Sequence, residues 1–77
     1  MDERLTPLPW EKLVDVFERE GFRIVRERGD HVVMTKSGIV RPLVIPRYRS
    51  VPVFIIRNNL RTARISREEF FRLLGIT

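Results

Sequence analysis

His31 is the one histidine in the chain and the residue best suited to acid–base chemistry. An imidazole is the side chain best matched to moving a proton near neutral pH. His31 follows Gly29 and Asp30, a turn sequence beside which a substrate backbone can approach closely. A lone histidine is more often a plain surface residue. Here, however, Val32 and Met34 share one face of the predicted strand, which places His31 on the opposite, open face.

Positive charge is concentrated in the centre of the chain. The 77 residues carry a net charge of +5, with 15 basic and 10 acidic side chains. Residues 22–64 alone hold ten basic and two acidic side chains, a net charge of +8. Arginine supplies nearly all of these cations, and it grips phosphates with two donors and stacks on bases. The pattern favours contact with nucleic-acid phosphates, although arginine also serves simply to solvate a surface.

For an RNA substrate, the proton that an imidazole would move is the one on the 2′-hydroxyl, because its removal lets that oxygen attack the adjacent phosphate. The charge that develops on this phosphate must be offset by hydrogen-bond donors that are already in place. Six basic residues flank the predicted sheet and its connection to the next helix, and the sequence does not rank them. Tyr48, in the same basic connection, is suited to stacking on a base or donating to a phosphate. Asp30 could orient the imidazole, but a turn aspartate that bonds its own backbone is the commoner case. The predicted substrate-binding residues are Arg26, Arg28, Gly29, Lys36, Arg41, Arg47, Tyr48 and Arg49.

Other chemistries find no support in the residue types. The chain has no cysteine, so it has no disulfide framework and no thiolate metal site. There is no phosphate-cradling glycine-rich loop and no serine–histidine–aspartate set, and six of the ten acidic residues lie within residues 1–21. We expect no metal and no cofactor. No apolar run approaches the roughly 20 residues that cross a bilayer, and a cytoplasmic protein is expected.

The hydrophobic periods place these residues on predicted elements. Apolar residues at helical spacing predict a helix over residues 9–20, with Pro7 and Pro9 in its first turn and Gly21 as its stop. The period then becomes two and predicts strands over residues 22–28, 31–36 and 39–46. Pro42 lies inside the third strand, which is tolerable on a sheet edge.

Two further helices complete the pattern. Residues 52–63 form the second helix, with Val53, Ile56, Leu60 and Ala63 on its buried side. Ser66 and Glu69 make a capping box that opens the third, which ends at Gly75. The order α-β-β-β-α-α predicts one α+β domain over residues 1–77, a three-stranded antiparallel meander with helices packed on one face.

Several short motifs, in this order and spacing, resemble those of the HicA toxins, the small ribonucleases of bacterial and archaeal toxin–antitoxin pairs. The resemblance covers nearly the whole chain. It departs from the family pattern beside the histidine, where Asp30 and Val32 replace residues that are often serine and histidine. The matching segments are Gly21-Phe22, Gly29-Asp30-His31, Val44-Ile45-Pro46, Leu60-Arg61 and Ile65-Ser66-Arg67-Glu68-Glu69-Phe70.

This resemblance implies a double-stranded-RNA-binding-domain-like fold and a toxin of a type II toxin–antitoxin system. It implies a metal-independent endoribonuclease that cleaves mRNA, an mRNA interferase, with His31 as general acid and base and Gly29 shaping the turn. It also implies a HicB-like antitoxin partner that covers the active site.

Two alternatives remain open at this stage. The first is a non-catalytic RNA-binding module with the same fold, in which His31 is incidental. The second treats the last two helices as a DNA-reading helix-turn-helix. The second is weakened by Glu68 and Glu69, which would open the recognition helix with two negative charges facing DNA phosphates.

Overall fold

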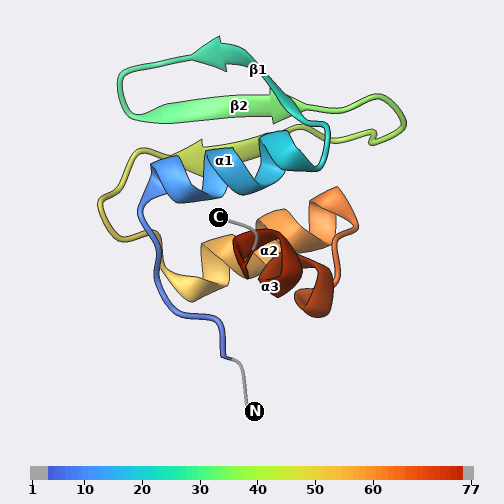
Figure 1. Ribbon diagram of the computed structural model, residues 1–77. Coiled ribbons are helices and arrows are strands. Elements are labelled where there is room, and N and C mark those ends of the chain that lie inside the picture. Colours follow the sequence, from blue (N-terminus) through green and yellow to red (C-terminus); the bar gives the residue numbers. More distant parts are fainter. Residues whose placement is uncertain (1–3, 76–77) are drawn as a thin grey trace.

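The computed structural model describes residues 4–75 and shows the predicted order of elements. The three strands form one antiparallel sheet in the order β1-β2-β3 (Figure 1). The α+β meander expected from the sequence is therefore confirmed. The elements are α1 (Trp10–Arg19), β1 (Arg23–Glu27), β2 (His31–Thr35), β3 (Leu43–Pro46), α2 (Val53–Ala63) and α3 (Arg67–Gly75).

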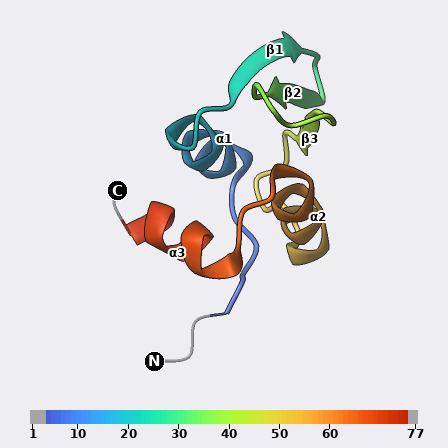
Figure 2. The same ribbon diagram turned by 90° about the vertical axis from the view of Figure 1, so that its right-hand side faces the viewer.

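All three helices lie on the same side of the sheet. Helices α1 and α2 both contact β3, and α3 packs against α1 on the side away from the strands (Figures 1 and 2). The space between the layers holds one apolar core, to which the helices contribute fully buried residues such as Phe17, Ile56 and Phe70. Within residues 4–75 no helix covers the other face of the sheet, so that face is open to contact with other molecules (Figure 1).

Helix α1 begins and ends where proline and glycine dictate. Pro9 is the N-cap in an extended conformation, so it lies just outside the first turn, and Pro7 precedes it; the prediction that both belong to that turn was wrong. At the other end Gly21 has φ of 102°, and the amides of Gly21 and Phe22 bond back to the carbonyls of Glu18 and Phe17. This is a Schellman stop, which requires a left-handed residue.

Strand β3 is shorter than the sequence pattern predicts. It starts at Leu43, and residues 39–42 belong to the connection from β2. The predicted strand over residues 39–46 was wrong at its start, because Pro42 has no amide hydrogen to give to the ladder and stands just before the strand. The edge position of β3 is as predicted.

The buried side of α2 differs from the prediction at two positions. Val53 is only half-buried, whereas Asn59 is buried and its side-chain amide donates to the Val44 carbonyl on β3 at 3.3 Å. At the start of α3 the Glu69 amide bonds to the Ser66 hydroxyl, as a capping box requires. In a full capping box the Glu69 carboxylate would also accept from the Ser66 backbone amide. That part of the prediction was wrong, because the carboxylate accepts from the Arg72 guanidinium instead.

No helix within residues 4–75 is both long and apolar enough to cross a membrane.

The Gly21 stop gives a stability prediction. Gly21→Ala places a Cβ on a residue with φ of 102°, and that Cβ lies 3.3 Å from the flexible end of Lys36. The left-handed backbone dominates the cost, so we expect the free energy of unfolding to fall by about 1–2 kcal/mol in chemical denaturation. Gly29→Ala is the matched control, because its φ is not positive and a Cβ there meets nothing within 4 Å. An equal loss in both variants would contradict this account.

Candidate active site

His31 opens β2 on the face of the sheet that has no helices. Along β2 the side chains of Val32 and Met34 are completely buried beneath the helices, while His31 alternates to the other face with 35% of its side chain exposed. Its partner across the sheet is Pro46 on β3. The imidazole is thus half-buried and lies beside an open surface.

Asp30 holds the imidazole in a defined orientation. One carboxylate oxygen, Oδ1, lies 2.8 Å from His31 Nδ1. This hydrogen bond is the main cause that lowers the pKa of Asp30 below its ordinary value of 3.8, and a bond from its own backbone amide adds to the effect. A carboxylate only accepts, so Nδ1 carries the proton and Nε2 is left as the basic nitrogen. Asp30 therefore does more than bond its own backbone, the role that sequence reasoning favoured.

Backbone hydrogen bonds from two neighbouring segments hold the backbone of Asp30 and His31 in place. The Arg28 amide donates to the His31 carbonyl at 2.9 Å and closes the β1–β2 turn. The Arg47 amide donates to the Asp30 carbonyl, also at 2.9 Å. Gly29, between them, has no positive φ and open space where a Cβ would stand. The backbone therefore does not need glycine there, and the turn is open to approach.

Two of the predicted phosphate-binding arginines lie at this end of the sheet. Arg26 on β1 stands opposite Val33, so it projects from the same open face as His31. Arg28 belongs to the turn that leads into His31, and both arginines are exposed. A β-bulge at Val25 sets this register, since Ile24 and Arg26 pair with consecutive residues of β2.

Arg47 is placed differently from its predicted role. Its guanidinium lies 5.0 Å from the centre of the Trp10 ring and bonds to Glu27 at 2.5 Å. Glu27 stands opposite the buried Val32, so this cluster lies on the helix side of the sheet, away from His31. Arg47 joins the start of α1 to the ends of β1 and β3, and its cation is already engaged.

The remaining predicted residues fall into two groups. Tyr48 and Arg49 are exposed in the connection after β3, near the end of the sheet that carries His31, and the Tyr48 carbonyl accepts from the Trp10 amide. Lys36 follows the far end of β2, roughly 16 Å from His31 at about 3.3 Å per residue, with its ammonium 5.7 Å from the centre of the Phe22 ring. Arg41, in the connection from β2 to β3, belongs to this far end.

Within residues 4–75 no three histidine, aspartate or glutamate side chains gather as a metal-ligand set. Of the acidic residues discussed above, Asp30 bonds to His31 and Glu27 to Arg47.

Comparison with known families now identifies the chain. A family model described as the HicA toxin of bacterial toxin–antitoxin systems matches residues 10–65, well over half of the 77 residues. The chain belongs to the HicA toxin family. The matched segment runs from the start of α1 to the residue before Ser66 and includes His31, its turn and the whole sheet. No curated protein and no solved structure matches the chain significantly.

The Asp30–His31 contact in this HicA family member gives a prediction about acid titration. Because the folded-state pKa of Asp30 is lowered, its contribution to stability is present above pH 3.8 and is lost as the pH falls through the lowered value. We expect the Asp30 carboxyl, followed by NMR, to titrate below pH 3.8. In a His31→Gln variant the midpoint should rise toward its ordinary value. A midpoint that does not move on loss of the imidazole would show that the backbone bond alone lowers the pKa.

Proposed function

We propose that this HicA family member is an mRNA-cleaving endoribonuclease, the toxin of a toxin–antitoxin pair, in which His31 is the general acid and base. The observation that carries the proposal is the half-buried His31 imidazole on the open sheet face, with Nδ1 bonded to Asp30 at 2.8 Å. A carboxylate bonded to one ring nitrogen fixes the direction in which the other nitrogen points. The family match supports the toxin class.

The proposed reaction uses the ribose of the substrate as the nucleophile. His31 Nε2 takes the proton of the 2′-hydroxyl, and the oxygen attacks the neighbouring phosphorus. The bond from phosphorus to the 5′-oxygen breaks, and that oxygen takes up a proton, which the imidazolium can return. The products are a 2′,3′-cyclic phosphate and a 5′-hydroxyl. This route needs no metal ion.

Arg26 and Arg28 are the residues we assign to the phosphate. Both are exposed at the His31 end of the sheet, and Arg26 shares its face. A guanidinium placed beside the attacked phosphate offsets the negative charge that develops on it during the reaction. Tyr48 and Arg49, which follow β3 at the same end, extend this surface toward the flanking nucleotides. Lys36 and Arg41 at the far end are suited only to more distant phosphates of a longer RNA.

A HicB-like antitoxin is the protein partner that membership in the family implies. On the sheet face that carries His31, the apolar side chain of Val44 is 50% exposed, and Tyr48, in the connection after β3, is 51% exposed. An antitoxin seated on this face would bury these side chains and close off the imidazole at the same time. An mRNA substrate would place the protein in the cytoplasm.

His31→Ala tests the catalytic role directly. The His31 side chain is half-buried on the open face, so its replacement removes no packing from the core. The free energy of unfolding should therefore change by no more than about 1 kcal/mol. Loss of a general base should slow cleavage by about 10²- to 10⁴-fold, while RNA affinity persists because arginines make the phosphate contacts. Thermal unfolding, RNA binding and cleavage of a labelled RNA should be measured together.

Thr35→Ala is the matched control, because Thr35 lies on the same face at the far end of β2 and carries no titratable group. It should cut RNA at the wild-type rate, in EDTA as well as in buffer. A folded His31→Ala protein with wild-type activity would eliminate the catalytic assignment and favour a non-catalytic RNA-binding module. Activity lost in EDTA and restored by magnesium would eliminate the metal-independent route.

The charged end of the sheet gives a separate prediction about affinity. Arg28→Ala should weaken binding of a short single-stranded RNA and reduce the slope of log K against log salt by about 0.7, the value for one lost phosphate contact. Lys36→Ala, at the opposite end of the sheet, should leave the affinity for an RNA of a few nucleotides unchanged. Titrations at several salt concentrations measure both. Equal losses of affinity in the two variants would show that RNA binding depends on the net charge of the protein and not on contacts at the His31 end of the sheet.

A further inference from the structure

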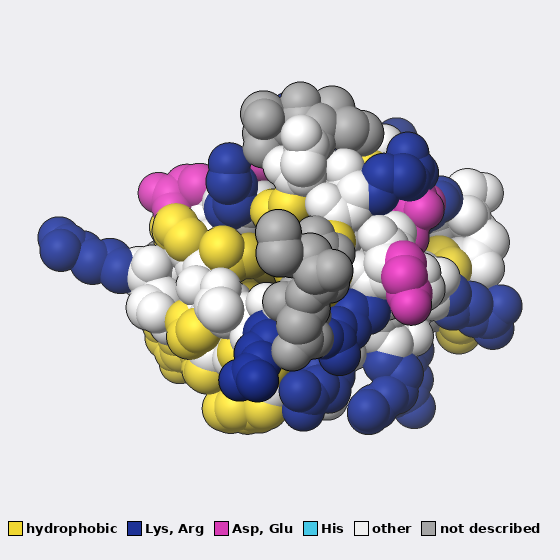
Figure 3. Space-filling view, turned by 60° about the horizontal axis from the view of Figure 1, so that its bottom comes forward, with side chains coloured by type: hydrophobic (Ala, Val, Ile, Leu, Met, Phe, Trp, Pro, Cys, Tyr) yellow, Lys and Arg dark blue, Asp and Glu magenta, His cyan; other side chains and the backbone are white. Residues whose placement is uncertain are grey.

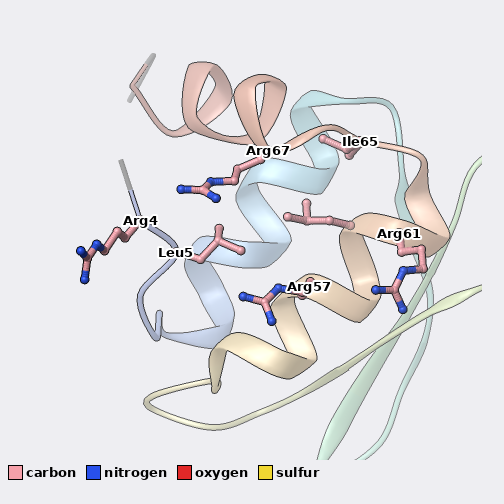
Figure 4. A pocket seen from close by; sticks show the side chains of 7 residues that line it. Arg4, Leu5, Arg57, Arg61, Ile65 and Arg67 are labelled. Atoms are coloured by element: carbon pink, nitrogen blue, oxygen red, sulfur yellow. The ribbon is translucent and has the colours of Figure 1, made fainter. Parts of the chain in front are cut away.

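A concave site separate from His31 lies on the helical side of the molecule, among the N-terminal segment, α2 and the connection to α3. The hollow has a volume of about 520 Å³. Figure 4 shows that the side chains that line it come from these three parts of the chain. The lining residues are Arg4, Leu5, Arg57, Leu60, Arg61, Ile65 and Arg67.

Four of the seven lining residues are arginines, and none is acidic. Arg57 and Arg61 stand one turn apart on α2, both are exposed, and neither forms an ion pair with another residue in the described part of the chain. The Arg67 guanidinium lies 5.9 Å from the centre of the Phe71 ring. Like charges around a concave surface focus a positive potential, so the hollow attracts an anionic ligand.

The floor of the hollow is aliphatic. Leu60 and Ile65 are buried members of the core, only 5% and 7% exposed, and Leu5 is partly buried and packs against the same core. A charged rim around an apolar centre is the usual composition of a protein-binding surface. Binding of unpaired RNA bases relies instead on aromatic side chains for stacking, and none of the seven described lining residues is aromatic.

The hollow and His31 face different directions. Figure 3 looks onto the helical side, where lysine and arginine side chains gather beside hydrophobic ones and no histidine is visible. The sheet and the apolar core lie between this side and the open face that carries His31 (Figure 1). A ligand in the hollow would therefore leave the imidazole uncovered.

We propose that the hollow binds an acidic segment of a partner protein, in which leucine or isoleucine side chains stand between aspartates or glutamates. The aliphatic side chains fill the space over Leu60 and Ile65, and the carboxylates pair with Arg57 and Arg61. The complementarity of both charge and polarity selects this occupant. The proposal does not depend on RNA cleavage, and it assigns a binding site separate from the one at His31.

The experiment uses the full-length ¹⁵N-labelled protein and a synthetic peptide with two leucines flanked on each side by glutamates. We expect its addition to shift the amide signals of Arg57, Leu60, Arg61 and Ile65, and to leave those of β2 in place. The double variant Arg57→Glu and Arg61→Glu should bind the peptide at least about tenfold more weakly. Its RNA cleavage should stay at the wild-type rate, which separates this site from the proposed catalytic one.

Two controls keep the result specific. Arg23→Glu with Arg41→Glu makes the same change in net charge at exposed positions outside the hollow, and it should bind the peptide as the wild type does. A peptide with serines in place of the leucines should bind more weakly. Equal loss in both double variants, equal binding of the serine peptide, or shifts at these amides caused by a short RNA instead of the peptide would each overturn the proposal.

Discussion

The pleat of the central strand β2 fixes where every group of the candidate site lies. Val32 and Met34 point into the core and are completely buried, and each such side chain stabilises the fold by about 1.5–3 kcal/mol. They pair across the sheet with Ile45 and Leu43, which are equally buried. A shift of one residue would expose both and bury the imidazole, so the core that holds the sheet together also keeps His31 on the open face.

The same alternation sorts the charged residues into two sets with different roles. On the helix side, Glu27 bonds to Arg47 and the guanidinium covers Trp10, so these charges connect α1 to the sheet. On the open side, the imidazole keeps a carboxylate partner of its own in Asp30. Because Arg47 donates its backbone amide to the Asp30 carbonyl, the first set also supports the second. The helix side therefore holds the candidate site in place, while the imidazole itself lies on the open face.

Features that depend on residues close together in the chain can be predicted from the sequence. The period of apolar residues and the glycine after α1 predict the order of elements, and Val32 and Met34 predict the face of His31. Features that depend on partners distant in sequence were missed. Arg47 looked like any other basic residue because Glu27 and Trp10 are far from it in the chain, and Asn59 gave no sign of its bond to Val44. The sequence shows that Asp30 is the neighbour of His31. Whether its carboxylate bonds to its own backbone or to the imidazole depends on the side-chain rotamers, which the sequence does not give.

The arginine-lined hollow and the open sheet face that carries His31 belong to opposite layers of one small domain. Helix α2 lies between these two surfaces. On one side α2 carries Arg57 and Arg61, and on the other Asn59 is buried and bonds to the Val44 carbonyl of β3. Since Ile56 and Leu60 pack into the same core as β2, α2 cannot shift without disturbing the sheet. A close-packed core of this kind holds both surfaces in fixed relation, so the proposed protein ligand on the helices and the proposed RNA on the strands would not compete for one surface.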